Sequence, residues 1–194
     1  MTTAALFPIA AETVADALRD LDRLDPAAAT PCQEWDAATL INHFSGTSVA
    51  LGRIGRGEPL DPDNPWGQGE PAGDGDWRGR LADNVDGLGV AWAKPDAWQG
   101  SVSFGTSEMT AEAVGQMAFA EALLHGWDLS RAAGRSLHIP DEVGAELLRL
   151  VALSADLGRS MGAYGAEIMI AEDRPAFDRA LALAGRDPDW ADRS

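Results

Sequence analysis

Apolar residues recur at steps of three and four along two segments of this chain, and polar side chains interrupt both series. The first series runs Leu40, His43, Thr47, Ala50, Ile54, and the second runs Val114, Ala118, Glu121, His125, Asp128, Ala132. Such steps place side chains on one face of an α-helix, so each segment predicts a helix with one inward face. Two histidines and a carboxylate would then face a helical core, where polar groups are unfavourable unless something pairs them.

A divalent metal ion held between two helices is the simplest partner for these polar groups, because imidazole nitrogen and carboxylate oxygen are common transition-metal ligands. Glu121 and His125 stand four residues apart on one helix face, while His43 would arrive from the other helix. We predict a metal site formed by His43, Glu121 and His125, open to water or substrate as in catalytic zinc sites. Zinc is the first expectation, and the same ligands suit nickel and other first-row ions.

Asp128 lies three residues beyond His125, on the same predicted face. We expect its carboxylate to accept a hydrogen bond from the imidazole N–H of a metal ligand, which would fix the orientation of that ring. Direct ligation of the metal, a pair with Arg131 and a solvent-facing position are the alternatives. His138 stands in a loop before Pro140 and is expected at the surface.

Cys32 is the only cysteine of the chain, which excludes an intrachain disulfide. We interpret it as a small buried hydrophobe, and a fourth metal ligand or a reactive thiol are the alternatives. Trp35 and Trp127 stand close to the proposed ligands in the sequence. We interpret both as core residues rather than as the lining of a substrate pocket.

Apolar periodicity and capping residues predict a mainly helical chain. Helices are expected over residues 8–24, 36–57, 77–94, 110–133, 141–161 and 175–184. Pro8 suits a first helical position and Asp36 suits an N-cap, while Gly134 and Gly185 follow helix ends.

The remaining segments carry weaker patterns. Val102 and Phe104 alternate with polar residues, which indicates a short extended piece. The apolar positions of the predicted fifth helix are Val143, Leu147, Leu150 and Leu157. The last ten residues, GRDPDWADRS, are polar and are expected on the surface. Residues 58–76 are rich in Pro, Gly and Asp, and we interpret them as a crossover between helices that need not be antiparallel. This crossover is either a lid over the metal or a plain surface loop.

Length and charge narrow the classes of function. The chain has 194 residues, and we expect residues 1–194 to form a single domain, with a bundle over about 8–134 and a helical extension over about 140–190. Acidic residues outnumber basic ones 31 to 15, for a net charge of −16, which argues against binding to nucleic acid or to anionic membranes. There is no apolar run long enough to span a bilayer and no basic region typical of a signal peptide, so we expect a cytoplasmic protein.

Two segments of the chain resemble a known superfamily. TPCQEWDAATLINHF at 30–44 and EALLHGWDLSRAAG at 121–134 are similar to the DinB-like superfamily, and more narrowly to its branch related to mycothiol-dependent maleylpyruvate isomerase. GRDPDW at 185–190 and the dipeptide FG at 104–105 resemble small actinobacterial metal-binding relatives of that isomerase. The resemblance covers most of the chain.

The resemblance implies an all-α fold, a DinB-like four-helix bundle with a divalent metal, usually zinc, near one end. The three metal ligands of the family fall on His43, Glu121 and His125. The resemblance also implies mycothiol or a similar low-molecular-weight thiol as cosubstrate, with transfer or isomerisation of a small-molecule electrophile through a metal-bound thiolate. It allows a homodimer. The isomerase has a further C-terminal domain that the region after Gly134 does not resemble, so the resemblance does not extend to maleylpyruvate as substrate.

Three alternatives to a thiol-dependent enzyme remain open. The first is a hydrolase that uses metal-activated water. The second is a stress protein that binds a metal or a thiol without catalysing a reaction. The third is an ordinary helical bundle without a metal, in which the polar core residues pair with one another.

Overall fold

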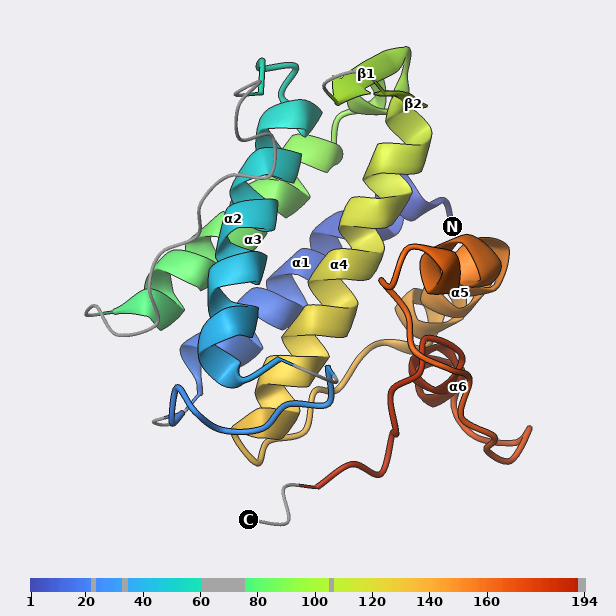
Figure 1. Ribbon diagram of the computed structural model, residues 1–194. Coiled ribbons are helices and arrows are strands. Elements are labelled where there is room, and N and C mark those ends of the chain that lie inside the picture. The colour runs from blue at the N-terminus through green and yellow to red at the C-terminus, as the bar shows by residue number, and fades with distance from the viewer. Residues whose placement is uncertain (22–23, 33–34, 61–75, 105–106, 192–194) are drawn as a thin grey trace.

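The protein is mostly α-helical, as the sequence predicted (Figure 1). The computed structural model describes residues 1–21, 24–32, 35–60, 76–104 and 107–191. Four helices form a bundle: α1 (Thr3–Arg19), α2 (Ala37–Gly55), α3 (Trp77–Trp92) and α4 (Ala111–Ala132). Two further helices follow, α5 (Asp141–Ser160) and α6 (Ala176–Leu183). Helix α5 packs beside α4 and α1, and α6 packs against α5.

Helices α2 and α3 run in the same direction (Figure 1). Gly55 near the end of α2 lies against Trp92 at the end of α3, and Trp92 Nε1 donates to the carbonyl of Leu51 at 3.0 Å. This agrees with the prediction that the crossover joins helices that need not be antiparallel. Residues 61–75 of the crossover lie outside the described residues. The prediction that the crossover is either a lid or a plain surface loop falls on these residues.

The two ends of α1 differ from the prediction. Pro8 was expected as the first helical position, but Thr2 caps the helix with its hydroxyl and Pro8 lies inside it. The helix ends at Arg19 instead of near residue 24, because Leu21 donates to the carbonyl of Leu18 at 3.3 Å in a tighter turn that leaves the helix axis.

The other bundle helices begin and end within one turn of the prediction. Asp36 caps α2 and Thr110 caps α4, each by accepting a backbone N–H three residues ahead. Gly134 follows the end of α4 with a φ of 70°, the left-handed conformation that glycine adopts most readily. Local capping signals therefore predicted these ends well.

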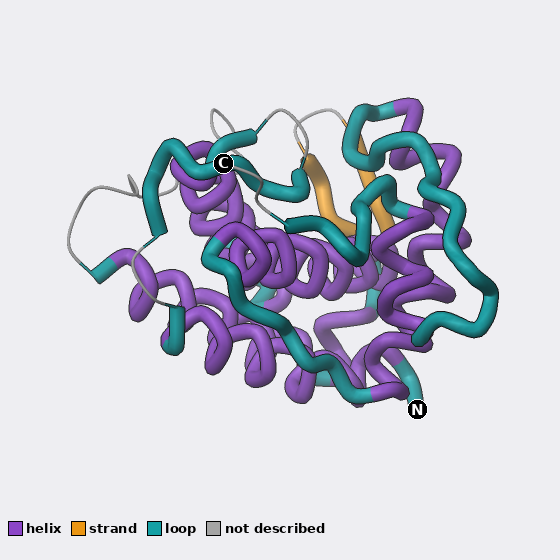
Figure 2. Tube along the Cα trace, turned by 90° about the horizontal axis from the view of Figure 1, so that it is seen from below, coloured by secondary structure: helices purple, strands orange, loops and turns teal. Residues whose placement is uncertain are grey.

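A small hairpin closes the end of the bundle where α4 begins. The short 3₁₀ helix η1 (Pro95–Trp98) leads into β1 (Ser101–Phe104), which pairs antiparallel with β2 (Ser107–Thr110). The extended piece predicted at 102–104 is β1, whereas its partner strand was not predicted. The strands lie together beside the helices in Figure 2.

Aromatic side chains fill the core at this same end. Phe7 of α1 is fully buried and its ring centre lies 6.5 Å from that of Trp92, 6.4 Å from that of Trp98 and 5.5 Å from that of Phe119. Such offset and edge-on pairs add to the stabilisation from burial. The apolar core continues along the bundle to the start of α2, where Leu40 and Phe44 are also fully buried.

The C-terminal region corrects two predictions. Of the four apolar positions predicted for the fifth helix, Val143, Leu147 and Leu150 are buried in α5, but 64% of the surface of Leu157 is exposed. The buried face of α5 continues from Leu150 through Val151, Ala155 and Gly158, and Gly158 contacts Tyr164, so Leu157 falls beside this face and not on it. The polar tail was expected on the surface, but Arg186 is only 4% exposed.

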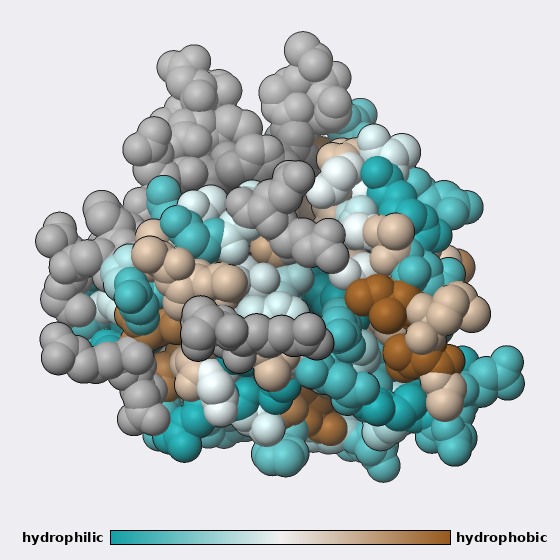
Figure 3. Space-filling model, turned by 60° about the horizontal axis from the view of Figure 1, so that its bottom comes forward, coloured by the Kyte–Doolittle hydropathy of each residue, from teal (hydrophilic) through white to brown (hydrophobic). Residues whose placement is uncertain are grey.

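On the face seen in Figure 3, hydrophilic side chains alternate with small groups of apolar ones. None of the helices in the described part of the chain has both the length and the apolar character that a membrane span requires.

Candidate metal centre

The start of α2 determines where His43 lies. The carboxylate of Asp36 accepts the N–H of Thr39 at 2.8 Å, and the hydrogen bonds from Thr39 lower the pKa of Asp36. A β-bridge between Ala29 and Asp36 ties the preceding loop to the same point. Because His43 follows within two turns of this fixed start, its side chain has a defined direction towards α4.

The three predicted ligands meet between α2 and α4. His43 Nε2 lies 3.3 Å from Glu121 Oε2, and His125 Nε2 lies 3.3 Å from the same oxygen. The two imidazole rings are 5.0 Å apart and nearly perpendicular, at 82°. One ligand atom from each residue therefore lies within 4.8 Å of the other two. The structure brings together the three side chains that the sequence singled out.

The centre is open on one side. The side chains of His43 and Glu121 keep 32% and 28% of their surface exposed, whereas His125 keeps 7%. Trp35 lies against both histidines, with ring centres 4.6 Å from His43 and 5.9 Å from His125. Trp35 is half-buried, so it both packs on the core, as predicted, and borders the exposed side of the cluster.

Neighbouring charges set the protonation of the cluster. Burial disfavours the charged form of both Glu121 and His125. For Glu121 the two imidazoles outweigh burial and lower the pKa of the carboxyl group. For His125 the carboxylates of Glu121 and Asp128 outweigh burial and raise the pKa to about 9. Without a metal, the cluster is thus held together as a carboxylate and an imidazolium.

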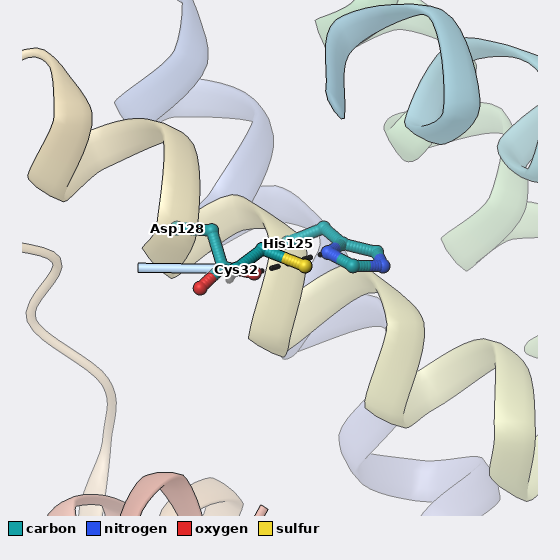
Figure 4. Close-up of side chains that lie close together, drawn as sticks. All are labelled: Cys32, His125 and Asp128. Carbon is teal, nitrogen blue, oxygen red and sulfur yellow. Dashed lines mark hydrogen bonds and ion pairs between the residues drawn. The ribbon is translucent and has the colours of Figure 1, made fainter. Parts of the chain in front are cut away.

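Asp128 lies on the opposite side of the His125 ring from Glu121. Its Oδ2 is 3.0 Å from His125 Nδ1 (Figure 4), and the residue is fully buried. Arg131, the alternative partner considered for Asp128, instead donates to the carbonyl of Trp190. A solvent-facing position is excluded.

Arg186 is the second partner of Asp128, and the sequence did not point to it. Its Nε lies 3.0 Å from Oδ1 and its Nη2 lies 2.9 Å from Oδ2 of Asp128. Burial raises the pKa of Asp128, but the positive charges and hydrogen bonds of Arg186 and His125 outweigh burial, so the pKa of Asp128 is lowered. Burial lowers the pKa of Arg186, but the carboxylate of Asp128 outweighs burial, so the pKa of Arg186 is raised. The segment GRDPDW at 185–190 resembles the family, but its sequence does not indicate which side chain turns inward.

Cys32 lies beside this group. Arg186 Nη2 lies 3.8 Å from its Sγ, and ligand atoms of Cys32, His125 and Asp128 fall within 4.8 Å of one another (Figure 4). Burial raises the pKa of the Cys32 thiol to about 11. Of the other residues considered, Trp127 is buried in the core and His138 is exposed, both as predicted.

A family model described as the mycothiol maleylpyruvate isomerase N-terminal domain matches residues 7–130. The chain belongs to this family. The region matched to the mycothiol maleylpyruvate isomerase N-terminal domain contains His43, Glu121, His125 and Asp128. Arg186 lies beyond it, together with α5 and α6.

Two relatives of the chain have names that assign no activity. The chain is 27% identical over 164 residues to two uncharacterized proteins of Mycobacterium tuberculosis, MT0763 of strain CDC 1551 and Rv0738 of strain H37Rv. The aligned region covers 81% of this chain and 82% of each relative. No solved structure matches the chain significantly.

Proposed function

We propose that this member of the mycothiol maleylpyruvate isomerase N-terminal domain family is a metal-dependent enzyme that joins mycothiol, or a similar small thiol, to a small-molecule electrophile or isomerises that electrophile. The observation that carries the proposal is the convergence of His43 Nε2 and His125 Nε2 on one oxygen of Glu121, at 3.3 Å each. The family description supports the thiol.

The donor set fits zinc. Two imidazole nitrogens and one carboxylate oxygen form a usual ligand set of catalytic zinc sites. Ligands bound at about 2.0 Å in a tetrahedron lie about 3.3 Å from one another, and the two distances to Glu121 Oε2 are 3.3 Å. The exposed sides of His43 and Glu121 leave room for a further ligand. We propose that these three residues hold the metal, with zinc favoured over nickel and other first-row ions.

Each residue then has a defined task. A bound zinc ion would supply acidity, so that a thiol beside it loses its proton at neutral pH. His43, Glu121 and His125 hold and orient the site, and the carboxylate of Glu121 reduces its net positive charge. Trp35 covers one side of the two imidazole rings. In a transfer by addition, the thiol sulfur bonds to the electrophilic carbon, and a proton is taken up by the atom that receives the displaced electron pair.

Metal analysis tests the metal centre directly. Protein purified without a histidine tag is expected to contain about one equivalent of zinc, or of another first-row ion, per chain. His125→Ala and His43→Ala are expected to lose it. His138→Ala is the matched control, because His138 is exposed and lies away from the cluster. Wild-type protein without a stoichiometric metal would support the ordinary bundle instead.

Turnover tests the reaction. The zinc-loaded protein is mixed with mycothiol and a panel of electrophiles, and S-conjugates or isomerised products are measured. We expect a rate above both the zinc-free protein and His43→Ala. Hydrolysis without need of a thiol would favour metal-activated water, and metal or mycothiol binding without turnover would favour a binding protein.

A further inference from the structure

A buried chain of polar contacts runs from the C-terminal region to the proposed metal ligand His125. Arg186 Nε and Nη2 contact the two oxygens of Asp128 at 3.0 and 2.9 Å. Asp128 Oδ2 contacts His125 Nδ1 at 3.0 Å. Arg186 and Asp128 are 4% and 0% exposed. These contacts are therefore shielded from water, which would otherwise weaken them.

The contacts determine which ring nitrogen of His125 keeps its proton when the ring is neutral, the form that binds a metal. An ionised carboxylate can only accept hydrogen bonds, so His125 Nδ1 must donate to Asp128. The forked contact with Arg186 keeps that carboxylate ionised and holds both of its oxygens. His125 Nε2 is then directed to the other side, where it faces Glu121.

Backbone contacts on both sides of Arg186 fix where its side chain enters the bundle. Gly185 follows α6 with a φ of 81° and approaches Gly165 so closely that a Cβ at either residue would meet the other's backbone within 3.4 Å. The N–H of Arg186 donates to the carbonyl of Leu181 at 2.9 Å. The side chain thus enters the bundle from a segment outside the region that matches the family.

We propose that Arg186 is a positioning residue of the metal centre, which acts through Asp128 to hold the imidazole of His125 in the orientation and tautomer that bind the metal. This rests on the proposed metal centre. Among the described residues, Arg186 forms its ion pair with Asp128 and has no hydrogen bond or ion pair with the three proposed ligands, so its effect on the metal passes through Asp128.

The affinity for zinc, measured by competition with a chelator, tests the proposal without any activity assay. Arg186→Met keeps an apolar side chain of similar length but removes the guanidinium group that contacts both oxygens of Asp128. This variant is expected to weaken zinc binding about 10- to 100-fold. Asp128→Asn is expected to weaken it similarly. The double variant should be little worse than Asp128→Asn alone, because both changes break the same contact chain. Arg186→Lys retains the charge and should fall between wild type and Arg186→Met.

Arg174→Met is the matched control. Arg174 also ties the C-terminal region together, through Asp178 and Asp189, but does not contact Asp128. The Arg174→Met variant is expected to bind zinc with an affinity within about twofold of wild type, even if its Tm is lower. Equal zinc affinity of wild type, Arg186→Met and Arg186→Lys would overturn the proposal. A wild-type chain that binds no zinc would overturn the metal centre itself, so the two failures are distinguishable.

Nuclear magnetic resonance of the ¹⁵N-labelled histidines detects the Nδ1 proton of His125 directly. A purely structural role of Arg186 would leave this signal unchanged. In zinc-loaded wild type we expect a solvent-protected Nδ1–H signal from His125. This signal should broaden or vanish in Arg186→Lys, which keeps the positive charge, and stay in Arg174→Met. An unchanged signal in folded Arg186→Lys and Arg186→Met would count against the positioning role.

Discussion

In the metal-free protein, His125 is a positively charged imidazolium over the physiological pH range. The carboxylates of Glu121 and Asp128 outweigh the effect of burial and raise its pKa to about 9. A metal must displace that proton. We expect zinc affinity to rise with pH, by roughly tenfold per unit from this group, and to level off near pH 9. Calorimetry in buffers with different ionisation enthalpies should show about one proton released from His125 at neutral pH. Binding without proton release would contradict this.

The same shift affects the stability of the metal-free fold with the opposite sign. A group whose pKa is raised on folding stabilises the folded state below its unfolded pKa, about 6.5 for histidine. That contribution is lost as the pH rises through about 9. Between about pH 6.5 and 9 the metal-free protein should therefore lose stability from this group, whereas the metal-bound protein, in which His125 has already lost this proton, should not, as urea unfolding with and without zinc at several pH values would show.

Cys32 is expected to be a poor nucleophile in the folded protein. Burial raises the pKa of its thiol from 9.0 to about 11, so at neutral pH the thiolate fraction falls about 100-fold. Alkylation by iodoacetamide, followed by mass spectrometry, should be correspondingly slower in the native protein than in denaturant, and should accelerate as the pH rises towards 11. Rapid alkylation of the native protein at neutral pH would support the reactive-thiol alternative.

At the scale of elements, α1 and α4 approach closely beside the metal centre. A Cβ at Gly126 would lie 2.5 Å from Val14 Cγ1, closer than side chains can pack. We expect Gly126→Ala to lower the free energy of unfolding by about 1–3 kcal/mol. Val14→Ala should recover part of this loss when combined with it, because it removes the clashing methyl groups. Urea unfolding of the two single variants and the double variant measures the coupling, and strictly additive losses would argue against a close contact.

Predictions about elements succeeded where the signal is local. Asp36 and Thr110 cap their helices by hydrogen bonds to residues three positions ahead, and such bonds depend only on neighbours in the sequence. Two local signals competed at the start of α1, and the hydroxyl of Thr2 prevailed over Pro8. Leu157 was misplaced because the buried face of α5 shifts by one residue after Leu150, to Val151, Ala155 and Gly158, and the last two are small residues that mark an inward face only weakly in the sequence.

At the scale of the whole molecule, a metal would tie α2 to α4 across the bundle. Zinc at about 100 times its dissociation constant adds about 2.7 kcal/mol by mass action. For a domain of this size we expect the Tm to rise by roughly 5–10 °C. His43→Ala should abolish the rise and His138→Ala should keep it, as scanning calorimetry with and without zinc would show. An equal rise in His43→Ala would place the zinc elsewhere. The homodimer that the resemblance allows stays a prediction.

The sequence by itself determined the helical bundle and the three proposed ligands. Both depend on the period of the α-helix, because residues three and four apart share a face whatever the rest of the chain does. His43, Glu121 and His125 therefore lie on the same faces as the apolar residues that turn towards the core. Only the tertiary structure decided the direction of α3 relative to α2 and the burial of Arg186. Arg186 meets Asp128 across 58 positions of sequence, and no periodic pattern links residues so far apart. Burial of a guanidinium is unfavourable unless a carboxylate pairs with it. Whether a carboxylate lies within reach depends on how the helices pack.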